Sequence, residues 1–343
     1  MDSNQSAEDA GAESSAPGSS TMRAIVGDRY GRPSALELRE VAIPAPDPDR
    51  VLVRVEAASL NMFDWHMITG TPYMARMMAG ISKPKRPIPG ADMAGVVVQV
   101  GENVSGFAVG DEIFGDVGFG AFAEYASVNP KAIVAKPAGV GFEQAAAVPL
   151  AGLTALQGLR DIGELRAGQR VIVNGASGGV GTFAVQIAKA LGAEVTAVCS
   201  TGKVEMARSI GADRVIDYTK DDYTTSERGY DLLFDNVGNR SWTNTRRVLA
   251  DDGINVTVTG PKHGLMGPVR NLAFRKVLSS IGSKRFTWFT AAVKADDLAF
   301  LAGLLESGEV VPVIERSYPL DQVQDALRYL AEGHALGKLV ITT

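Results

Sequence analysis

The sequence predicts an α/β protein with two domains, one rich in short β-strands and one built on a doubly wound parallel sheet. Its 343 residues exceed the length of roughly 250 to 300 residues at which a single hydrophobic core stops growing. From Met22 to about Val148 the chain consists of short β-rich runs separated by glycine and proline. From Arg170 onward, apolar runs alternate with helical segments, as expected of parallel βαβ units.

The N-terminal residues 1–21 are rich in serine, alanine, glycine and acids. They contain neither a basic segment nor an apolar core, so we expect a disordered tail and no secretory signal. Met22 opens the first strand-like run, and the alternative that it is the biological start stays open. Short strands separated by turn signals predict a partly barrel-like β domain, in the runs VLVRVEAASL, GVVVQVG, GDEIFGD and GAFAEYASV.

A helical segment rich in alanine and leucine, FEQAAAVPLAGLTALQGL, follows and is interrupted at Pro149. After it, strands are predicted at Arg170–Asn174, Val195–Cys199, Arg214–Ile216, Asp231–Phe234 and Ile254–Val258. The next segment, PKHGLMGPVRNLAFRKVLSSIGSKRF, is locally basic and is interpreted as loop and helix. Two further helices are indicated by DDLAFLAGLLESGEVV and LDQVQDALRYLAEG, and KLVIT predicts a closing strand.

Composition excludes several classes of protein. Apolar residues make up 45% of the chain and charged residues 21%, which is typical of a water-soluble globular protein. The net charge is −5 and the basic residues are scattered, so nucleic acid is not expected as a partner. No apolar run approaches the ~18 residues of a membrane span, so membrane insertion is not expected. Cys199 is the only cysteine, which excludes intramolecular disulfides and fits a reducing, cytoplasmic compartment.

The segment VIVNGASGGVG predicts a phosphate-binding turn. The apolar run Val171–Val173 is typical of a buried strand, and helical spacing resumes at Phe183. Small residues between a strand and a helix allow the backbone to approach a pyrophosphate, which the helix N-terminus then binds. The alternative is a purely structural tight turn. The predicted dinucleotide-binding residues are Ala176, Ser177, Gly178, Gly179, Val180 and Gly181.

The residues after the second strand favour NADPH over NADH. An NAD site places an acidic residue about 20 residues beyond the glycines, where it binds the ribose 2′-hydroxyl. Here Ser200, Thr201 and Lys203 occupy that region, and hydroxyls with an ammonium are suited to a 2′-phosphate. Tyr218 closes the third strand, where it flanks the adenine or contacts the same phosphate. The alternatives are a solvated lysine and an ordinary aromatic residue at a strand end.

Several motifs in one order carry a family resemblance: AASLNMFDWHMITG, PIPGADMAGVVVQVGENVSGFAVGDEIFG, AAAVPLAGLTALQGL, GASGGVGTFAVQIAKALGAEV, GADRVIDY, FDNVG and GKLVIT. The chain from Met22 to Thr343 resembles the medium-chain dehydrogenase/reductases, and within them the zinc-free quinone oxidoreductases and enone reductases. The resemblance implies a groES-like catalytic domain, residues 22–147 and 289–343, around an inserted Rossmann domain, residues 148–288. It also implies a homodimer.

The positions that hold catalytic zinc in alcohol dehydrogenases of this superfamily carry other residues here. By motif, Asn61 stands at the first ligand position, Ala91 and Asp92 replace a His–Glu pair, and Leu150 falls near the third ligand. This set lacks the nitrogen and sulfur ligands of a tetrahedral zinc centre. The three histidines have no ligand spacing either, so no metal is expected.

Without zinc, alcohol–ketone interconversion loses the Lewis acid that stabilises its developing alkoxide. A quinone or an α,β-unsaturated carbonyl is already electrophilic, and ordinary hydrogen-bond donors can stabilise its oxygen. We therefore expect hydride transfer from NADPH to a conjugated carbonyl or quinone. The alternatives are an NADP-dependent alcohol dehydrogenase, an enoyl-thioester reductase, and, from another class, a cofactor-binding structural or regulatory protein without turnover.

The resemblance also implies roles for individual residues. Asn61 and Asp64 are expected near the nicotinamide ribose, with Asn61 bonding the substrate oxygen. Tyr73 stands where related reductases carry an active-site tyrosine, which either protonates the product or only shapes the pocket. For Asp64 the alternative is a turn cap, and for Lys338 the alternative is an exposed side chain. Further contacts to the cofactor are expected from Thr154, Asn236, Gly238 and Lys338, the last at the pyrophosphate.

Overall fold

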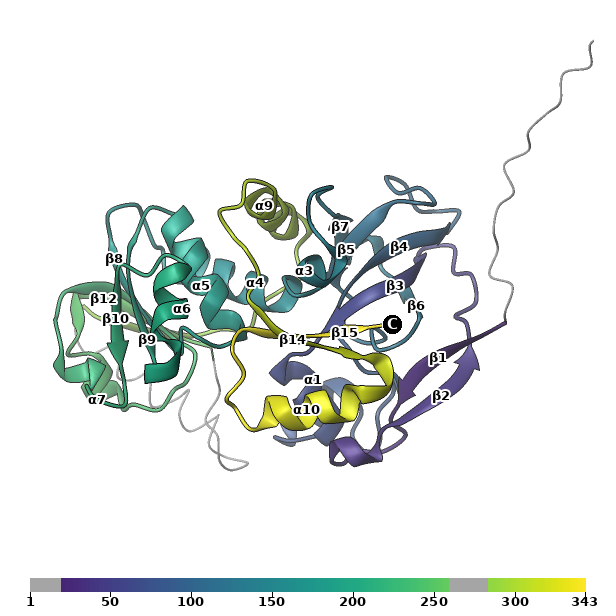
Figure 1. The fold of residues 1–343 in the computed structure, drawn as a ribbon, viewed down its shortest axis with the longest axis horizontal. Helices are drawn as coiled ribbons and strands as arrows, with labels where there is room; N and C mark the ends of the chain where they lie inside the picture. Colours follow the sequence, from purple (N-terminus) through teal and green to yellow (C-terminus); the bar gives the residue numbers. More distant parts are fainter. Residues whose placement is uncertain (1–19, 259–282) are drawn as a thin grey trace, which may run out of the picture.

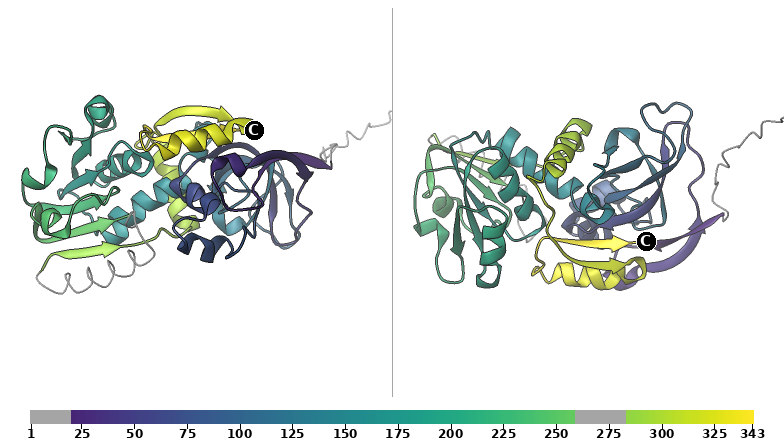
Figure 2. Two further views of the ribbon diagram at one scale, coloured as in Figure 1. Left: turned by 90° about the horizontal axis from the view of Figure 1, so that it is seen from below. Right: turned by 45° about the horizontal axis from the view of Figure 1, so that its top comes forward.

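The computed structural model describes residues 20–258 and 283–343. They form two lobes, a parallel-sheet lobe and a β-rich lobe, which lie side by side in Figures 1 and 2. The predicted disordered tail lies outside the described residues except for its last two. Those two differ from the prediction, because the carbonyl of Ser20 accepts a hydrogen bond from Ile43 and Thr21 begins strand β1. The predicted loop-and-helix segment also lies outside the described residues up to residue 282.

The parallel-sheet lobe contains a six-stranded sheet in the order β10-β9-β8-β11-β12-β13. All of its strands run parallel, and the order reverses between β8 and β11, as in a doubly wound dinucleotide-binding sheet. The strands are β8 (Arg170–Asn174), β9 (Glu194–Cys199), β10 (Arg214–Asp217), β11 (Tyr230–Asp235), β12 (Leu249–Thr257) and β13 (Arg285–Trp288).

The first four predicted strands of this sheet are confirmed to within one residue at each end. The fifth, β12, begins five residues earlier than expected, because its pairing with β11 continues through a register shift between Leu249 and Ile254. The sixth, β13, was not predicted. It is a four-residue edge strand whose residues are all partly or fully exposed, so it carries no buried apolar run to reveal it.

Helices connect these strands. Helix α5 follows the glycine loop and buries Phe183 and Ile187, the residues whose spacing predicted it. Pro149 stands at the first position of α4, where its missing N–H and fixed φ are tolerated. The helices are α4 (Pro149–Leu156), extended by the π-helical turn Gln157–Ile162, α5 (Gly179–Ala190), α6 (Val204–Ser209) and α7 (Trp242–Thr245).

The β-rich lobe holds a seven-stranded sheet in the order β14-β15-β3-β4-β5-β7, with β6 paired to β3. A smaller sheet pairs β1 with β2. The strands are β1 (Thr21–Val26), β2 (Glu37–Ala42), β3 (Val51–Ser59), β4 (Asp92–Val100), β5 (Glu112–Asp116), β6 (Tyr125–Val128), β7 (Ile133–Ala135), β14 (Ile314–Pro319) and β15 (Lys338–Thr342). Because β15 pairs with β3, the end of the chain returns to the larger sheet that β3 to β7 form.

The remaining helices are α1 (Met62–Thr69), α2 (Met74–Ala79), α3 (Phe142–Ala146), α9 (Ala295–Glu306) and α10 (Val323–Ala331). Both late helices and the closing strand were predicted and are confirmed. None of the helices within the described ranges is both long enough and apolar enough to span a bilayer. The predicted fold class, a β-rich domain combined with a doubly wound parallel sheet, is confirmed, while the domain boundaries stay a prediction.

One backbone contact joins the lobes at the glycine loop. The N–H of Gly337, just before β15, donates to the carbonyl of Ser177 at 2.9 Å, and Gly178 and Gly337 form an isolated parallel bridge. Lys338, the first residue of β15, therefore lies beside the glycine loop, and β15 continues from there into the sheet of the other lobe.

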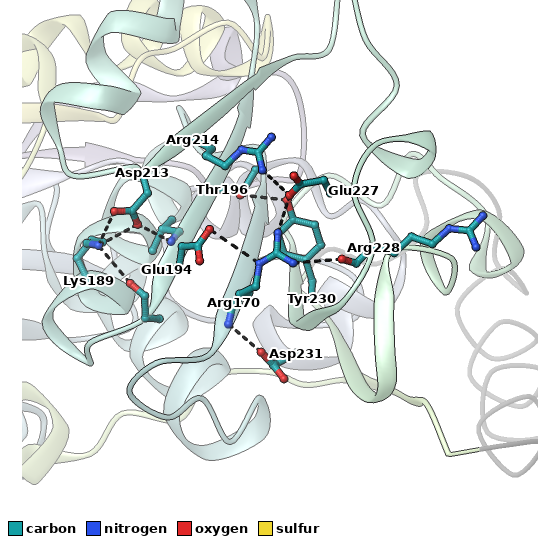
Figure 3. Close-up of polar contacts among 12 residues, drawn as sticks. Arg170, Lys189, Glu194, Thr196, Asp213, Arg214, Glu227, Arg228, Tyr230 and Asp231 are labelled. Carbon is teal, nitrogen blue, oxygen red and sulfur yellow. Dashed lines mark hydrogen bonds and ion pairs between the residues drawn. The ribbon is translucent and has the colours of Figure 1, made fainter.

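The amino edge of the parallel sheet carries a network of exposed charges (Figure 3). Arg170 donates to Glu227 at 2.6 Å, lies 3.8 Å from Glu194, and stacks over the ring of Tyr230 at 4.7 Å. Arg214 also pairs with Glu227. The four charged side chains are 29% to 49% exposed. We call Arg170, Glu194, Arg214 and Glu227 the amino-edge network.

A cavity of about 330 Å³ opens at the same edge. Its lining is mostly charged, and Arg285 and Glu164 within it pair through two contacts of 2.7 and 2.8 Å. It lies at the opposite end of the strands from the glycine loop, so it is not the dinucleotide site.

Candidate functional site

The carboxyl ends of β8 and β11 form the crevice where doubly wound sheets bind their ligands. Asn174 and Asp235 end these two strands, and the Asn174 amide donates to the Asp235 carboxylate at 2.8 Å. The same carboxylate oxygen accepts the backbone N–H groups of Val237 and Gly238 at 3.1 and 2.9 Å. Asp235 therefore shapes the loop that carries the predicted contacts Asn236 and Gly238.

The side-chain amide of Asn236 points to a ligand. Both its oxygen and its nitrogen are buried, and neither has a hydrogen-bond partner within the part of the chain that the structure describes. Buried polar side-chain atoms nearly always make hydrogen bonds, so an orphaned amide beside the glycine loop is suited to bind a polar group of a ligand.

The glycine loop between β8 and α5 is shaped by its small residues. A Cβ on Gly181 would lie 2.1 Å from the carbonyl oxygen of Gly175, so only glycine lets the helix pack this closely on the turn. A Cβ on Gly178, by contrast, would meet nothing closer than 3.6 Å. Gly178 therefore keeps space that the protein itself does not fill, as the second glycine of a dinucleotide loop does for the pyrophosphate.

Helix α5 presents a free N-terminus to this space. It is twelve residues long, Gly178 is its N-cap, and no side chain caps it. No acidic residue stands in its first turn. Its first N–H groups and the positive end of its dipole are thus available to an anion.

The end of the crevice beside β9 and β10 is where the 2′-phosphate site was predicted. Its side chains differ from that prediction in two ways. The ammonium of Lys203 donates to the backbone carbonyls of His334 and Ala335 at 2.6 and 3.2 Å, because α6 begins where the lobes meet. The hydroxyl of Thr201 donates to Asp217 at 2.6 Å, which places a carboxylate beside it. This hydrogen bond above all lowers the pKa of Asp217 to about 2.

Three other residues lie at this end of the crevice. Tyr218 is 54% exposed, and its N–H donates to the carbonyl of Cys199 at 3.0 Å, which sets it against the end of β9. Ser200 precedes the short turn at Thr201–Lys203. Cys199 itself is buried, and burial, with Asp217 as a smaller cause, raises the pKa of its thiol.

A buried charge cluster lies in the β-rich lobe, at the ends of four adjoining strands. Ser59, Asp92 and Asp116 are cross-strand neighbours on β3, β4 and β5, and Lys338 begins β15, which pairs with β3. We use the name buried charge cluster for Asp64, Asp92, Asp116 and Lys338, which are at most 7% exposed.

Asp92 and Lys338 meet at Asn61. The ammonium of Lys338 donates to Asn61 Oδ1 at 2.5 Å and lies 3.6 Å from Asp92 Oδ2. Asn61 Nδ2 donates to Asp92 Oδ2 at 2.8 Å, and Asp92 also accepts from Ser59 Oγ and from the N–H of Leu150. Burial raises the pKa of Asp92 and lowers that of Lys338, while their mutual attraction opposes both shifts.

Asp64 holds the turn that presents Asn61. Asn61 is the N-cap of α1, and Asp64, three residues on, accepts its N–H at 2.8 Å and that of Ala91 at 3.1 Å. Burial, followed by the nearby Asp92 charge, raises the pKa of Asp64 to about 7. The same two causes raise the pKa of Asp116 to about 7.

Comparison with known proteins identifies the family. Residues 47–138 match the family model described as alcohol dehydrogenase GroES-like domain, and residues 210–341 match the one described as zinc-binding dehydrogenase. The chain is 36% identical over 336 residues to a 2-methylene-furan-3-one reductase of Solanum lycopersicum, covering 94% of this chain and 79% of the relative. The chain belongs to the medium-chain dehydrogenase/reductase superfamily, in its quinone oxidoreductase branch.

Two further similarities agree. The NADPH-dependent alkenal/one oxidoreductase, chloroplastic, of Arabidopsis thaliana is 35% identical, with 93% of this chain and 79% of the relative covered. The structure of the quinone oxidoreductase from Coxiella burnetii superposes with a TM-score of 0.83 at 28% identity, covering 94% of this chain and 99% of that one. The chain is therefore an oxidoreductase of this superfamily.

The structure brings together the three positions that motif alignment assigned to zinc ligands. Asp92 bonds both Asn61 and the backbone of Leu150. An amide, a carboxylate and an ammonium thus converge at the positions that motif alignment assigned to zinc ligands. Among the described residues, no three histidine, cysteine or acidic side chains are placed to hold a metal ion.

Two predicted contacts lie apart from this network. The hydroxyl of Thr154 donates to the carbonyl of Leu150 one turn earlier in α4. Tyr73 is 47% exposed at the start of α2, and its ring faces the guanidinium of Arg76 at 5.4 Å.

Lys338 was expected at the pyrophosphate as an alternative to an exposed side chain. It is neither exposed nor directed outward. Its aliphatic stem passes Gly179 of the glycine loop, and its ammonium continues inward to Asn61, because Asp92 attracts it there.

Sequence reasoning missed Asp116, Ser59 and Asp217 as members of the site. Each is the last residue of a strand. Each also lies beside the end of a neighbouring strand at which a residue had been singled out from the sequence. Because neighbouring strand ends meet in space, a polar residue at the end of each β-run is the signal that would have found them.

Proposed function

We propose that this chain is an NADPH-dependent reductase that transfers hydride to a quinone or an α,β-unsaturated carbonyl without zinc. The observation that carries the proposal is the Asn61–Asp92–Lys338 network at the zinc position of the superfamily, beside an uncapped glycine-loop helix. The printed names of relatives, a 2-methylene-furan-3-one reductase and an NADPH-dependent alkenal/one oxidoreductase, agree with this substrate class.

The donor set argues for zinc independence. A zinc ligand must offer a lone pair from a deprotonated or neutral nitrogen, sulfur or carboxylate group. At these positions the chain offers the amide of Asn61, the apolar side chain of Leu150 and a carboxylate already bonded to four partners or neighbours. A cation is supplied by Lys338 instead.

The crevice fits a dinucleotide. The open space at Gly178, the free end of α5 and the orphaned amide of Asn236 provide places for the pyrophosphate and for a further polar group of the cofactor. We assign the 2′-phosphate to Ser200, Thr201, Lys203 and Tyr218, and the nicotinamide half to Thr154, Asn236, Gly238 and the neighbourhood of Asn61.

When bound, the cofactor supplies the hydride. The chain's own residues position the acceptor and exclude water. Asn61 donates an N–H to the acceptor oxygen, on which negative charge develops, and Asp64 fixes the backbone of that turn. Tyr73, at the exposed start of α2, either donates the proton that the product needs or shapes the mouth of the pocket. A Tyr73→Phe variant separates these roles, since only the first predicts a loss of kcat.

The decisive experiment measures NADPH oxidation in the presence of a metal chelator, with an o-quinone or a simple enone as acceptor and with a primary alcohol plus NADP+ in reverse. Acceptor-dependent oxidation that survives the chelator supports the proposal. Chelator-sensitive alcohol oxidation would overturn it in favour of an alcohol dehydrogenase. Tight NADPH binding without turnover of any acceptor, including an enoyl thioester, would indicate a binding protein.

Cofactor preference has its own test. Lys203→Ala removes a cation that we place at the 2′-phosphate, so the dissociation constant of NADPH should rise about tenfold or more, the worth of a hydrogen bond to a charged group. NADH binding should not change. Asp217→Asn removes a negative charge beside Thr201, so it should shift the preference further toward NADPH. Equal effects of either variant on both cofactors would contradict the phosphate assignment.

We further propose a cytoplasmic homodimer, supported by the single cysteine of the chain and by the superfamily. Light scattering behind a sizing column tests the dimer: a mass of one chain would contradict it.

A further inference from the structure

The side chain of Asn61 is held from both ends. Its Oδ1 accepts from Lys338 at 2.5 Å, and its Nδ2 donates to Asp92 at 2.8 Å. An ammonium can only donate, and an ionised carboxylate can only accept. The orientation of the amide is therefore dictated by its two charged neighbours.

Those neighbours are themselves immobile. Asp92 is fully buried at the start of β4 and is fixed by Ser59 Oγ at 3.1 Å and by the Leu150 N–H at 3.0 Å. Lys338 is 2% exposed at the start of β15, and its stem lies against Gly179. The amide is thus clamped between rigid strand ends, where water has little access.

One hydrogen of the Asn61 amide remains. Nδ2 carries two hydrogens, and Asp92 takes one of them. If the amide turned by 180°, Oδ1 would lie where Nδ2 now lies. An oxygen lone pair, in place of the second N–H, would then face the oxygen of the substrate. The clamp therefore decides whether Asn61 attracts or repels the developing charge.

We propose that Lys338 and Asp92 are positioning residues that act on the reaction through Asn61, and that Lys338 is not a ligand of the cofactor. This inference rests on the proposed function, because it assigns Asn61 to the substrate oxygen. It distinguishes two roles for Lys338 that predict changes in two different quantities. A positioning residue changes kcat, whereas a pyrophosphate ligand changes the affinity for NADPH.

The test is a double-mutant cycle of Asn61→Ala, Lys338→Met and the combined variant, with kcat measured at saturating NADPH and acceptor. Lys338→Met should lower kcat by about 10- to 100-fold, approaching the loss of one oxyanion donor. In the Asn61→Ala background it should lower kcat no further, because a residue that acts through another adds nothing once that one is removed. The dissociation constant of NADPH, followed by its fluorescence, should stay the same.

Two kinetic results would overturn the proposal. One is a loss of kcat that multiplies with that of Asn61→Ala. The other is weaker NADPH binding in Lys338→Met with kcat retained at saturation, which would assign Lys338 to the cofactor. If Lys338→Met does not fold, Lys338→Met/Asp92→Asn removes both charges of the pair, and the same cycle is run with it.

A readout without turnover separates this inference from the proposed function. In protein labelled with 15N-asparagine, the side-chain amide signal of Asn61 is the one that disappears in Asn61→Ala. Lys338→Met should shift this signal, and Lys131→Met, a control at an exposed lysine in the turn Pro130–Ala132, should not. An unmoved signal overturns the clamp even in an active enzyme, whereas a wild-type protein that turns over no acceptor but shows the shift overturns the proposed function alone.

Discussion

The molecule contains two charge networks of opposite design. In the amino-edge network, two arginines face two glutamates and all four side chains remain partly exposed. In the buried charge cluster, three carboxyl groups face one ammonium with almost no access to solvent. Exposed charges of balanced sign add little to stability but cost little. Buried charges of unbalanced sign are expensive and are characteristic of functional sites.

The pKa directions express the same difference. Hydrogen bonds from Arg214 above all lower the pKa of Glu227, which therefore favours its charged form. Burial raises the pKa values of Asp64 and Asp116 to about 7. Folding therefore favours the charged carboxylate in the first network and the protonated acid in the second.

The largest expected effect comes from breaking the buried pair. Lys338→Met leaves Asp92 without its cation, and the loss of one partner from a buried pair typically costs about 3–5 kcal/mol of unfolding free energy. Lys338→Met/Asp92→Asn should recover most of this loss. Urea unfolding near neutral pH measures both. The matched control in the amino-edge network, Arg214→Met, should cost several-fold less, and equal costs would erase the distinction between the two networks.

The next effect is a pH dependence of opposite sign in the two networks. The Asp116 carboxyl has a pKa of about 7 in the folded protein and about 3.9 when unfolded. The contribution of Asp116 to stability is therefore fully present below the unfolded pKa and is lost as the pH rises through the folded pKa. Asp116→Asn mimics the protonated acid, so its stability relative to wild type should increase from pH 4 to pH 8 by about 2–4 kcal/mol.

The control for this prediction is Glu227→Gln. Because the pKa of Glu227 is lowered by its arginine partners, the wild-type advantage should be present at neutral pH and disappear as the pH falls below the usual range of a glutamate. If both variants showed the same sign of pH dependence, the comparison would fail.

The smallest effect is a dependence on salt. At about 1 M salt the Debye length is roughly 3 Å, which screens exposed pairs but hardly affects buried ones. The cost of Glu227→Gln should therefore vanish in high salt, while that of Lys338→Met should remain. The measurement is the difference in unfolding free energy between low and high sodium chloride. A salt-sensitive Lys338→Met would show that water reaches the cluster.

Much of this architecture followed from local patterns. The run Val171–Val173, the glycine turn and the helical spacing from Phe183 predicted β8, the loop and α5, because each rests on interactions close in sequence. The return of KLVIT to the first lobe came from family resemblance rather than from spacing, since no local rule specifies which distant strand β15 pairs with.

Some residues of the candidate site were named from the sequence, but their arrangement was not. Asn61, Asp64 and Asp92 were identified by motif, yet the position of the Lys338 ammonium depends on how β15 lies against β3, a contact between residues almost 280 positions apart. Asp217 likewise reaches Thr201 only because β10 and β9 are paired in register. Side-chain partners that are distant in sequence are set by the tertiary fold, and a single sequence does not specify them.

Cys199 has a practical consequence as the sole thiol of the chain. It lies buried at the end of β9, one residue before the predicted phosphate-binding serine. A thiol reagent can reach it only when this strand end opens. The rate at which the unmodified protein is labelled therefore measures how often the strand end opens. Bound dinucleotide should slow the labelling, and the degree of slowing reports how strongly each cofactor closes the crevice. The protein thus carries its own single-site reporter, with no engineered cysteine needed.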